Sequence, residues 1–355
     1  MQRTPIKPKA SPGKASSQIK AHSEKAPESQ KKWDGSDVFI STGSTLVDLA
    51  ISGGRTKYGG IPGGVLVEIF GPTGSGKTVM LCEIAGGVQR QGGKIQFKDP
   101  EARLNKQFAQ IFDLDVDEVD YSRPATVPEV FKPIRSWDPE PAGKIHGIFT
   151  DSLAALSTEM EQDDKDKTGM RRAKEFSEEC RKTCATITDK NFLMVCSNQE
   201  RQNVNAGPYA PKTSATGGTA IGYYSSLRLK FGNAQKIKEK RTVNGKEIIK
   251  VVGVETEVEV FKSSVWEPYH KATICILFAY GIDDIRTNLQ YVKDLTKGSG
   301  YCVGENKLSN SMNEAIVMVE EQNLEEELRE QVISIWNEVE ALFKMDRKKK
   351  SRNQE

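Results

Sequence analysis

Short apolar runs alternate with longer amphipathic segments through the middle of this 355-residue chain. The run at 65–70 has the length and the β-branched content of a buried strand. Further strands are expected at 93–101, 118–122, 144–151 and 191–199, with helices after the first strand, at 105–112, from 128 and at 170–188. Strands that alternate with helices in this way predict a mostly parallel sheet flanked by helices, which is an α/β fold.

The pattern changes after residue 223. Consecutive strands are expected at 227–231, 236–241, 246–262 and 271–280, with Asn244-Gly245 as a hairpin turn. Such strands predict an antiparallel extension of the parallel sheet. From residue 282 onward the periodicity is mainly helical, and we expect a small C-terminal domain that is helical or α/β.

Both ends of the chain differ in composition from its middle. The first 32 residues carry eight Lys or Arg against two Glu and are rich in Pro and Ser, and the last ten residues are basic too. We therefore expect a disordered basic tail at 1–36, a core domain at 37–281, a C-terminal domain at 282–345 and a basic tail at 346–355. Basic tails commonly contact nucleic acid, and a solvated tail that only aids solubility explains them equally well.

The composition of the whole chain, 37% hydrophobic and 28% charged, is typical of a globular protein in water. No apolar run approaches the roughly 20 residues that a transmembrane helix needs, and the first residues lack the apolar core of a signal peptide. The six cysteines form no CxxC pair and have no histidine at metal-binding spacing, so zinc is not expected. These observations favour the reducing cytoplasm and no membrane partner.

The strand at 65–70 leads directly into a phosphate-binding motif. The stretch GPTGSGKT at 71–78 matches G-x-x-x-x-G-K-[ST] at every defined position. Glycines let successive backbone N–H groups point at phosphate oxygens, while Lys77 reaches the β- and γ-phosphates and Thr78 ligates Mg²⁺. The expected nucleotide-binding residues are Gly71, Pro72, Thr73, Gly74, Ser75, Gly76, Lys77, Thr78 and Val79.

Polar residues end three of the later strands. In an open α/β sheet, ligands bind at the carboxyl ends of the strands. Asp151 is expected to hold Mg²⁺ directly or through water, and Glu101 to orient the water that attacks the γ-phosphate. Gln199 is expected to contact the γ-phosphate. Polar strand ends are common, so the prediction depends on finding all three in order after a complete phosphate-binding loop.

A long polar segment follows Gln199. It contains Arg201, Tyr209, Lys212 and several glycines before residue 219, and long loops in compact domains are usually functional. Cations combined with an aromatic side chain suit single-stranded nucleic acid, because phosphate contacts and base stacking act together. A surface loop that binds nothing is the other explanation.

Together these segments resemble the RecA family of DNA strand-exchange recombinases, in its bacterial and bacteriophage branch, over about residues 38–343. The markers are ISTGS (40–44), VEIFGPTGSGKT (67–78), DPEARL (99–104), DSLAAL (151–156), SNQER (197–201) and TGGTA (216–220). Each motif alone is weak, but their order and spacing are specific. The resemblance implies a RecA-like P-loop ATPase core, ATP and Mg²⁺ as cofactors, and a cytoplasmic location, in the host if the protein is viral.

For the nucleotide, the resemblance makes Glu101 the catalytic carboxylate and Gln199 the residue that senses the γ-phosphate. Phe108 falls where the family stacks an aromatic ring on adenine. Lys262 matches the first of two lysines that reach the neighbouring subunit's γ-phosphate, and Phe278 matches an aromatic residue near the same nucleotide. The ATP would therefore lie between subunits.

For DNA, the resemblance makes 159–169 and 201–218 the two DNA-binding loops. Tyr209 is the aromatic residue expected to stack on bases, and the family's DNA-contacting positions fall at Arg181, Arg201, Gly217 and Gly218. The implied partners are single- and double-stranded DNA, further copies of the chain in a helical filament, and single-strand-binding and mediator proteins.

The chain also departs from the family pattern. The second bridging lysine would fall at Ser264, and the family's N-terminal helix, which docks on the adjacent subunit, has no clear counterpart in 1–36. A basic end replaces an acidic C-terminal tail, and the hairpin at 236–250 is longer than usual. These departures concern assembly and regulation more than ATP chemistry.

The predicted function is that of an ATP-dependent recombinase that forms filaments on single-stranded DNA and catalyses homologous pairing and strand exchange. One alternative is a hexameric helicase-like motor on the same core, which would form closed rings instead of filaments. Another is a recombination mediator without catalytic activity, which the intact set of Lys77, Glu101 and Asp151 argues against.

Overall fold

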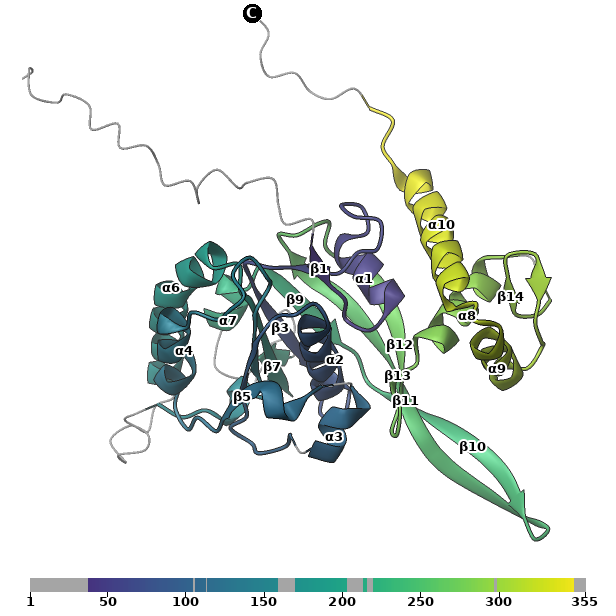
Figure 1. Cartoon of the computed structure of the whole chain (residues 1–355), viewed down its shortest axis with the longest axis horizontal. Coiled ribbons are helices and arrows are strands. Elements are labelled where there is room, and N and C mark those ends of the chain that lie inside the picture. The colour runs from purple at the N-terminus through teal and green to yellow at the C-terminus, as the bar shows by residue number, and fades with distance from the viewer. Residues whose placement is uncertain are drawn as a thin grey trace, which may run out of the picture. The chain divides into compact units, whose positions relative to one another are not determined.

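A large mixed sheet runs through the part of the chain that the computed structural model describes, which is residues 38–104, 106–112, 114–158, 170–202, 213–215, 220–296 and 299–347. Its main path has the strand order β13-β12-β11-β9-β3-β7-β6-β4-β5 (Figure 1). The phosphate-binding strand β3 therefore lies inside the sheet, with β9 on one side and β7 on the other.

The strands from β9 to β5 along this path are parallel, which confirms the prediction of a mostly parallel core. Their carboxyl ends share one edge of the sheet, which brings together residues distant in sequence. The bounds are β3 (Val65–Gly71), β4 (Ile95–Lys98), β5 (Val119–Ser122), β6 (Gly147–Thr150), β7 (Leu193–Gln202) and β9 (Leu227–Phe231).

The later strands extend the sheet in antiparallel fashion, again as predicted. β10 pairs with the first half of β11, and the short strand β8 pairs with the end of β7. The strand expected at 271–280 is shorter, because a turn at 278–280 separates β12 from β13. The bounds are β8 (Thr213–Ala215), β10 (Gln235–Val243), β11 (Lys246–Ser263), β12 (Lys271–Leu277) and β13 (Gly281–Ile282).

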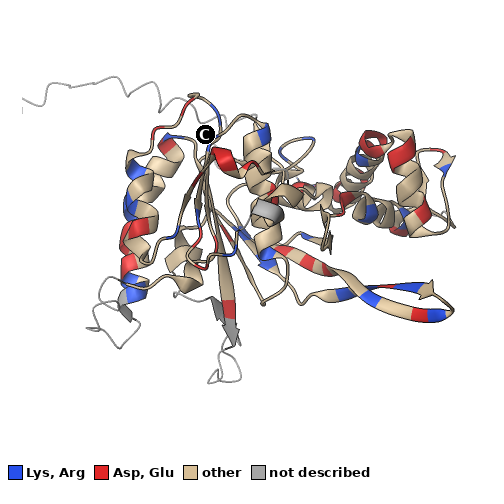
Figure 2. Ribbon diagram, turned by 60° about the horizontal axis from the view of Figure 1, so that its bottom comes forward, with Lys and Arg blue, Asp and Glu red and all other residues tan. Residues whose placement is uncertain are grey.

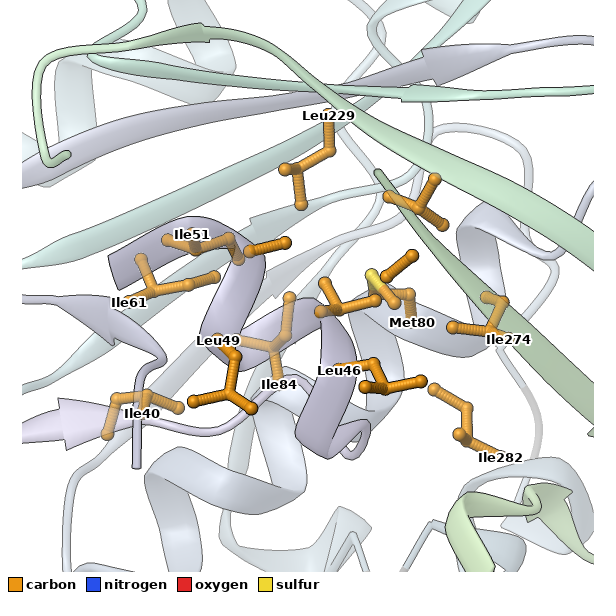
Figure 3. Close-up of a cluster of buried hydrophobic side chains, with 14 of the residues drawn as sticks. Ile40, Leu46, Leu49, Ile51, Ile61, Met80, Ile84, Leu229, Ile274 and Ile282 are labelled. Carbon is orange, nitrogen blue, oxygen red and sulfur yellow. The ribbon is translucent and has the colours of Figure 1, made fainter. Parts of the chain in front are cut away.

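Helices cover both faces of the parallel strands (Figure 1). Along β3, Val67 and Ile69 belong to one hydrophobic cluster, with α1 and α2, whereas Leu66 belongs to a second cluster with α4 and α6. This alternation is the period-2 pattern of a strand buried on both faces. Figure 3 shows the first cluster. The bounds are α1 (Thr45–Ser52), α2 (Lys77–Arg90), α3 (Lys106–Ile111), α4 (Val127–Ser136), α6 (Met170–Asp189) and α7 (Ala220–Tyr224).

The C-terminal segment combines helices with a small hairpin. It consists of α8 (Asp284–Leu295), β14 (Cys302–Val303), β15 (Asn306–Lys307), α9 (Met312–Gln322) and α10 (Glu325–Phe343). The described residues of the core and of the C-terminal segment belong to one compact unit, and the first hydrophobic cluster extends into α8 and α10. The Asp284 carboxylate also accepts hydrogen bonds from Thr45 N at 2.8 Å and Thr45 Oγ1 at 2.7 Å. The expected boundary at 281/282 stays a prediction.

The remaining strands, β1 (Phe39–Ile40) and β2 (Ile61–Pro62), form a separate antiparallel pair. Among the described helices, none combines the length and apolarity required to span a membrane. The expected tail at 1–36 lies outside the described residues, as does all of the expected tail at 346–355 except its first two residues.

Candidate nucleotide-binding site

The phosphate-binding loop connects the end of β3 at Gly71 to the start of α2 at Lys77. Gly74 and Gly76 have φ values of 75° and 98°, a region that strongly favours glycine. A Cβ on Gly76 would lie 2.2 Å from Ile276 Cδ1, whereas a Cβ on Gly74 would meet nothing within 4 Å. Backbone conformation thus selects glycine at both positions, and the surface beside Gly74 stays open to a ligand.

Lys77 is buried, and its side chain folds back over the loop. Its Nζ donates hydrogen bonds to the carbonyl oxygens of Gly71 at 3.1 Å and Pro72 at 2.6 Å. Burial lowers the pKa of Lys77, and the nearby Asp151 carboxylate opposes that shift. The ammonium group is therefore held at the mouth of the loop, where it can exchange carbonyl contacts for phosphate oxygens.

Thr78 and Asp151, the two residues predicted to bind Mg²⁺, contact each other directly. Thr78 Oγ1 donates a hydrogen bond of 2.7 Å to Asp151 Oδ2, although 73 positions separate the two residues. Ser197 Oγ, from β7, donates to the other carboxylate oxygen, Asp151 Oδ1. A hydroxyl and a carboxylate are oxygen donors of the kind that Mg²⁺ binds beside substrate phosphates.

Glu101 lies a short turn beyond β4 and not at the strand end. The strand ends at Lys98, because the Asp99 carboxylate accepts hydrogen bonds from Arg103 N and Leu104 N at 3.1 and 2.9 Å and so closes a turn. Ser152 Oγ donates to Glu101 Oε1 at 2.7 Å, and Arg103 Nη2 forms an ion pair with Glu101 Oε2. Both carboxylate oxygens are therefore fixed in position.

Gln199 lies directly opposite Gly71 in the register of β7 and β3. The prediction that the strand ends at Gln199 is wrong, because β7 continues to Gln202 and pairs there with β8. The Gln199 backbone N–H donates to Asn198 Oδ1 at 3.0 Å. The structure thus places the predicted γ-phosphate sensor beside the first glycine of the phosphate-binding loop.

These elements enclose one cavity with a volume of about 400 Å³. Val254, Ile276 and Phe278 form the apolar part of the lining, and Ile276 packs directly against Gly76 of the phosphate-binding loop. Phe278 is 59% exposed and comes from the turn after β12. The residues lining the cavity are Thr73, Gly74, Gly76, Lys77, Thr78, Val79, Arg103, Asp151, Ser152, Ser197, Gln199, Val254, Ile276 and Phe278.

The cavity lining does not include every predicted nucleotide residue. Gly71, Pro72 and Ser75 of the loop and the nearby Glu101 are not part of it, and neither are Phe108 and Lys262. Phe108, on α3, packs edge-to-face against Phe112 with ring centroids 4.9 Å apart. Lys262 Nζ donates to the carbonyl oxygens of Gly222 at 3.0 Å and Tyr223 at 2.8 Å, at the end of α7. Burial and the neighbouring Arg228 lower the pKa of Lys262. The adenine contact of Phe108 and the intersubunit contact of Lys262 stay predictions.

The predicted DNA-binding residues are only partly described. Arg181 is exposed on α6. The Arg201 backbone pairs with Ser214 in the β7–β8 ladder, so the second predicted loop starts in β7 and includes β8. Tyr209, Gly217, Gly218 and the first predicted loop at 159–169 lie outside the described residues.

Sequence reasoning missed three residues that contact the predicted catalytic groups. Arg103, Ser152 and Ser197 bind Glu101 or Asp151 through their side chains. Arg103 and Ser152 belong to the DPEARL and DSLAAL stretches, so position within those motifs was the available signal. A position within a motif does not predict which carboxylate the side chain contacts.

A buried polar network beside the cavity was missed as well. The fully buried Glu68 accepts from Arg228 Nε at 2.6 Å and from Asn198 Nδ2 at 2.9 Å. The Arg228 guanidinium also lies over the Phe70 ring, 4.4 Å from its centroid. A glutamate inside the apolar run at 65–70 was the signal, because a buried carboxylate needs a partner.

The fold and this geometry define a P-loop nucleoside-triphosphate-binding protein. The donor set fits the ligand: an open glycine loop and a lysine for phosphates, a hydroxyl–carboxylate pair for Mg²⁺, and an apolar wall for a base or sugar. Within the described ranges, no group of three or more His, Cys, Asp or Glu forms another candidate metal site.

Comparisons with known proteins extend this classification. A sequence model of the RecA N-terminal domain matches residues 28–283. The chain is 30% identical to protein RecA of Acinetobacter baumannii over 310 residues, 83% of each protein, and 31% identical to protein RecA of Borrelia hermsii over 308 residues, 83% of this chain and 81% of the relative. Protein RecA of Delftia acidovorans is 34% identical over 245 residues, which are 68% of this chain and 62% of that protein.

The chain belongs to the RecA family. This membership identifies it as an ATP-dependent DNA recombinase and confirms that prediction, while the helicase-like and mediator alternatives receive no support. The family uses ATP with Mg²⁺, binds DNA and forms filaments. Placement in a bacteriophage branch stays a prediction.

Proposed function

We propose that the cavity binds ATP with Mg²⁺ and hydrolyses it to ADP and phosphate when the chain is assembled on single-stranded DNA. The observation that carries the proposal is the 2.7 Å hydrogen bond between Thr78 and Asp151, beside a complete phosphate-binding loop. The hydroxyl and the carboxylate are both groups that bind Mg²⁺, and they come from distant segments of the chain. They lie next to the loop whose N–H groups are expected to bind the phosphates.

Binding and hydrolysis use different residues in this proposal. Lys77 and the loop N–H groups hold the phosphates, and Thr78 with Asp151 holds the metal, which supplies charge neutralisation at the γ-phosphate. Glu101 accepts a proton from the attacking water. Ser152 and Arg103 keep its carboxylate oriented, as their contacts with both of its oxygens support.

The nucleotide is shared between neighbouring subunits in the proposed filament. Lys262 of one copy contacts the γ-phosphate held by another copy, and Phe278 lies near the same nucleotide. For that contact Lys262 must leave the α7 carbonyls that it binds in the single chain. Because α7 directly follows the second DNA-binding loop, this exchange links nucleotide state to the DNA site.

DNA binding is assigned to the two loops at 159–169 and 201–218. Arg181, Arg201, Tyr209, Gly217 and Gly218 are the proposed contacts. Gln199 precedes the second loop and lines the nucleotide cavity, which supports a γ-phosphate-dependent change in DNA affinity. Single-strand-binding and mediator proteins are the further partners proposed, and the cytoplasm is the proposed location.

The test is ATP hydrolysis by the full chain with and without single-stranded DNA, alongside electron microscopy of the same mixtures. Stimulated hydrolysis with filaments is the expected result. A chain that binds DNA but hydrolyses ATP no faster with it than without it would contradict the proposal. Lys77→Ala serves as the control for contaminating ATPases, since it removes the phosphate-binding ammonium group.

A further inference from the structure

The hairpin formed by β10 and the start of β11 extends beyond the packed part of the sheet (Figure 1). Its register runs from Gln235 opposite Glu255 to Val243 opposite Lys246. From residue 240 to 250 every side chain is exposed, so neither face of the tip contributes to the core. A two-stranded ribbon is marginally stable alone, and its length is not explained by packing.

Positive charge is concentrated on this ribbon. Residues 235–251 contain six Lys or Arg and two Glu, and basic positions recur along it (Figure 2). The two glutamates pair with Lys240 and Arg241, each at 3.3 Å. The other four cations have no carboxylate in ion-pair distance within the described ranges; they are Lys236, Lys238, Lys246 and Lys250.

These cations lie on both faces of the ribbon. Lys238 and Lys240 are two positions apart in β10 and therefore lie on the same face of the ribbon. Ile249, which is opposite Lys240, lies on that face as well. Lys250 is opposite Glu239 and therefore lies on the other face, as does Lys246 opposite Val243. A ribbon with cations on both faces can contact two phosphate backbones at once.

Duplex DNA matches this arrangement better than a single strand does. The major groove admits a two-stranded β-ribbon and is bordered by a phosphate backbone on each side. Single-strand sites instead rely on aromatic side chains that stack on bases, and residues 235–251 contain no Phe, Tyr or Trp. We propose that residues 235–251 form a β-ribbon that binds the backbones of duplex DNA. The proposal does not depend on the nucleotide cavity.

The experiment measures binding of a short labelled duplex by the full chain across a range of salt concentrations, using fluorescence anisotropy. Lys238→Gln with Lys250→Gln removes one unpaired cation from each face, and adding Lys236→Gln and Lys246→Gln removes all four. Lys94→Gln with Lys144→Gln removes the same formal charge as the double variant just before β4 and β6. It serves as the control for net charge, although Lys94 is paired with Glu118.

The slope of log affinity against log salt should become shallower by about 1.8 in the double variant and about 3.6 in the quadruple variant, since each phosphate contact contributes about 0.9. The affinity at physiological salt should fall roughly tenfold or more in the double variant. The control should stay close to the parent, and DNA-stimulated ATP hydrolysis should be retained because the ribbon carries none of the proposed ATP residues.

Equal duplex affinity and salt slope in all variants would overturn the proposal. If strand exchange then still failed in the hairpin variants, the ribbon would instead contact a protein, for which Ile248 and Ile249, 48% and 54% exposed, offer apolar contact. A loss shared equally by the control would also overturn it, because the effect would then come from net charge alone.

Discussion

Arg103, which lines the nucleotide cavity, forms an ion pair with Glu101, so a guanidinium group lies between the cavity and the predicted catalytic carboxylate. Arg103 is also close enough to Lys77 to lower its pKa. The cavity wall therefore carries two cations from the same chain. This arrangement bears on affinity for a triphosphate as well as on the position of Glu101.

Arg103→Ala should raise the KM for ATP roughly tenfold, because a cation is lost and the Glu101 charge is left uncompensated beside the phosphates. The kcat should change less than about threefold, since Ser152 still holds Glu101. Steady-state hydrolysis on DNA measures both values. Arg103→Lys is the control and should lie nearer the parent. A lost kcat at unchanged KM would assign Arg103 to the chemical step instead.

Breaking the buried ion pair between Glu68 and Arg228 should lower the free energy of unfolding. Arg228→Met leaves the fully buried Glu68 carboxylate without its cation, and breaking a buried pair in this way costs about 3–5 kcal/mol. The free energy of unfolding in urea measures the loss. Replacing both residues, with Glu68→Met added, should recover part of it. If Arg228→Met is as stable as the parent, the hydrogen bond from Asn198 is enough to compensate the buried Glu68 carboxylate.

The local parts of the site could be predicted from the sequence because each depends on a short pattern. The glycine spacing at 71–78 and the apolar run before Asp151 identify two strand ends of one sheet, and the polar residues from Gln199 mark where the parallel pairing of β7 with β3 ends. Parallel topology then places them at the same edge. The long hairpin at Asn244-Gly245 was predictable for the same reason, since its turn is local.

Contacts between distant segments could not be predicted in this way. The pairing of Glu68 with Arg228 spans 160 positions, and that of Glu101 with Ser152 spans 51. Such pairs depend on the order of strands across the sheet and on side-chain rotamers, which no period in the sequence specifies. The turn that ends β4 before Glu101 was missed because the Asp99 side chain, not an apolar pattern, closes it.

Lys262→Ala tests the shared nucleotide. It should leave nucleotide binding by the single chain nearly intact, because Lys77 and Thr78 supply that binding. It should abolish the DNA-stimulated part of hydrolysis, since stimulation requires the neighbour's charge at the γ-phosphate. The reciprocal variant, Ser264→Lys, should maintain or raise turnover on DNA.

The measurement is ATPase activity against DNA concentration, with filament length scored in parallel. Thermal unfolding serves as the control, because Lys262 also binds the α7 carbonyls. Parent-like hydrolysis of Lys262→Ala on DNA would contradict the shared site.

Arg201→Ala tests the second DNA-binding loop. The Arg201 backbone lies in the β7–β8 ladder, so removing the side chain leaves the strand pairing in place. Affinity for single-stranded DNA should fall, and the slope of log affinity against log salt should become shallower by about 0.7, the contribution of one phosphate contact. Anisotropy with a labelled single strand measures both. An unchanged affinity and slope would place the DNA site elsewhere.

The most direct test of the proposed hydrolytic site is the turnover of Glu101→Gln on single-stranded DNA. Glutamine keeps the size of the side chain but cannot accept a proton from water. We predict that ATP and DNA binding, measured on the same preparation, stay close to those of the parent, while turnover falls at least about 100-fold. Parent-like turnover in this variant would contradict the assignment of Glu101 as the catalytic base, and with it the proposed site.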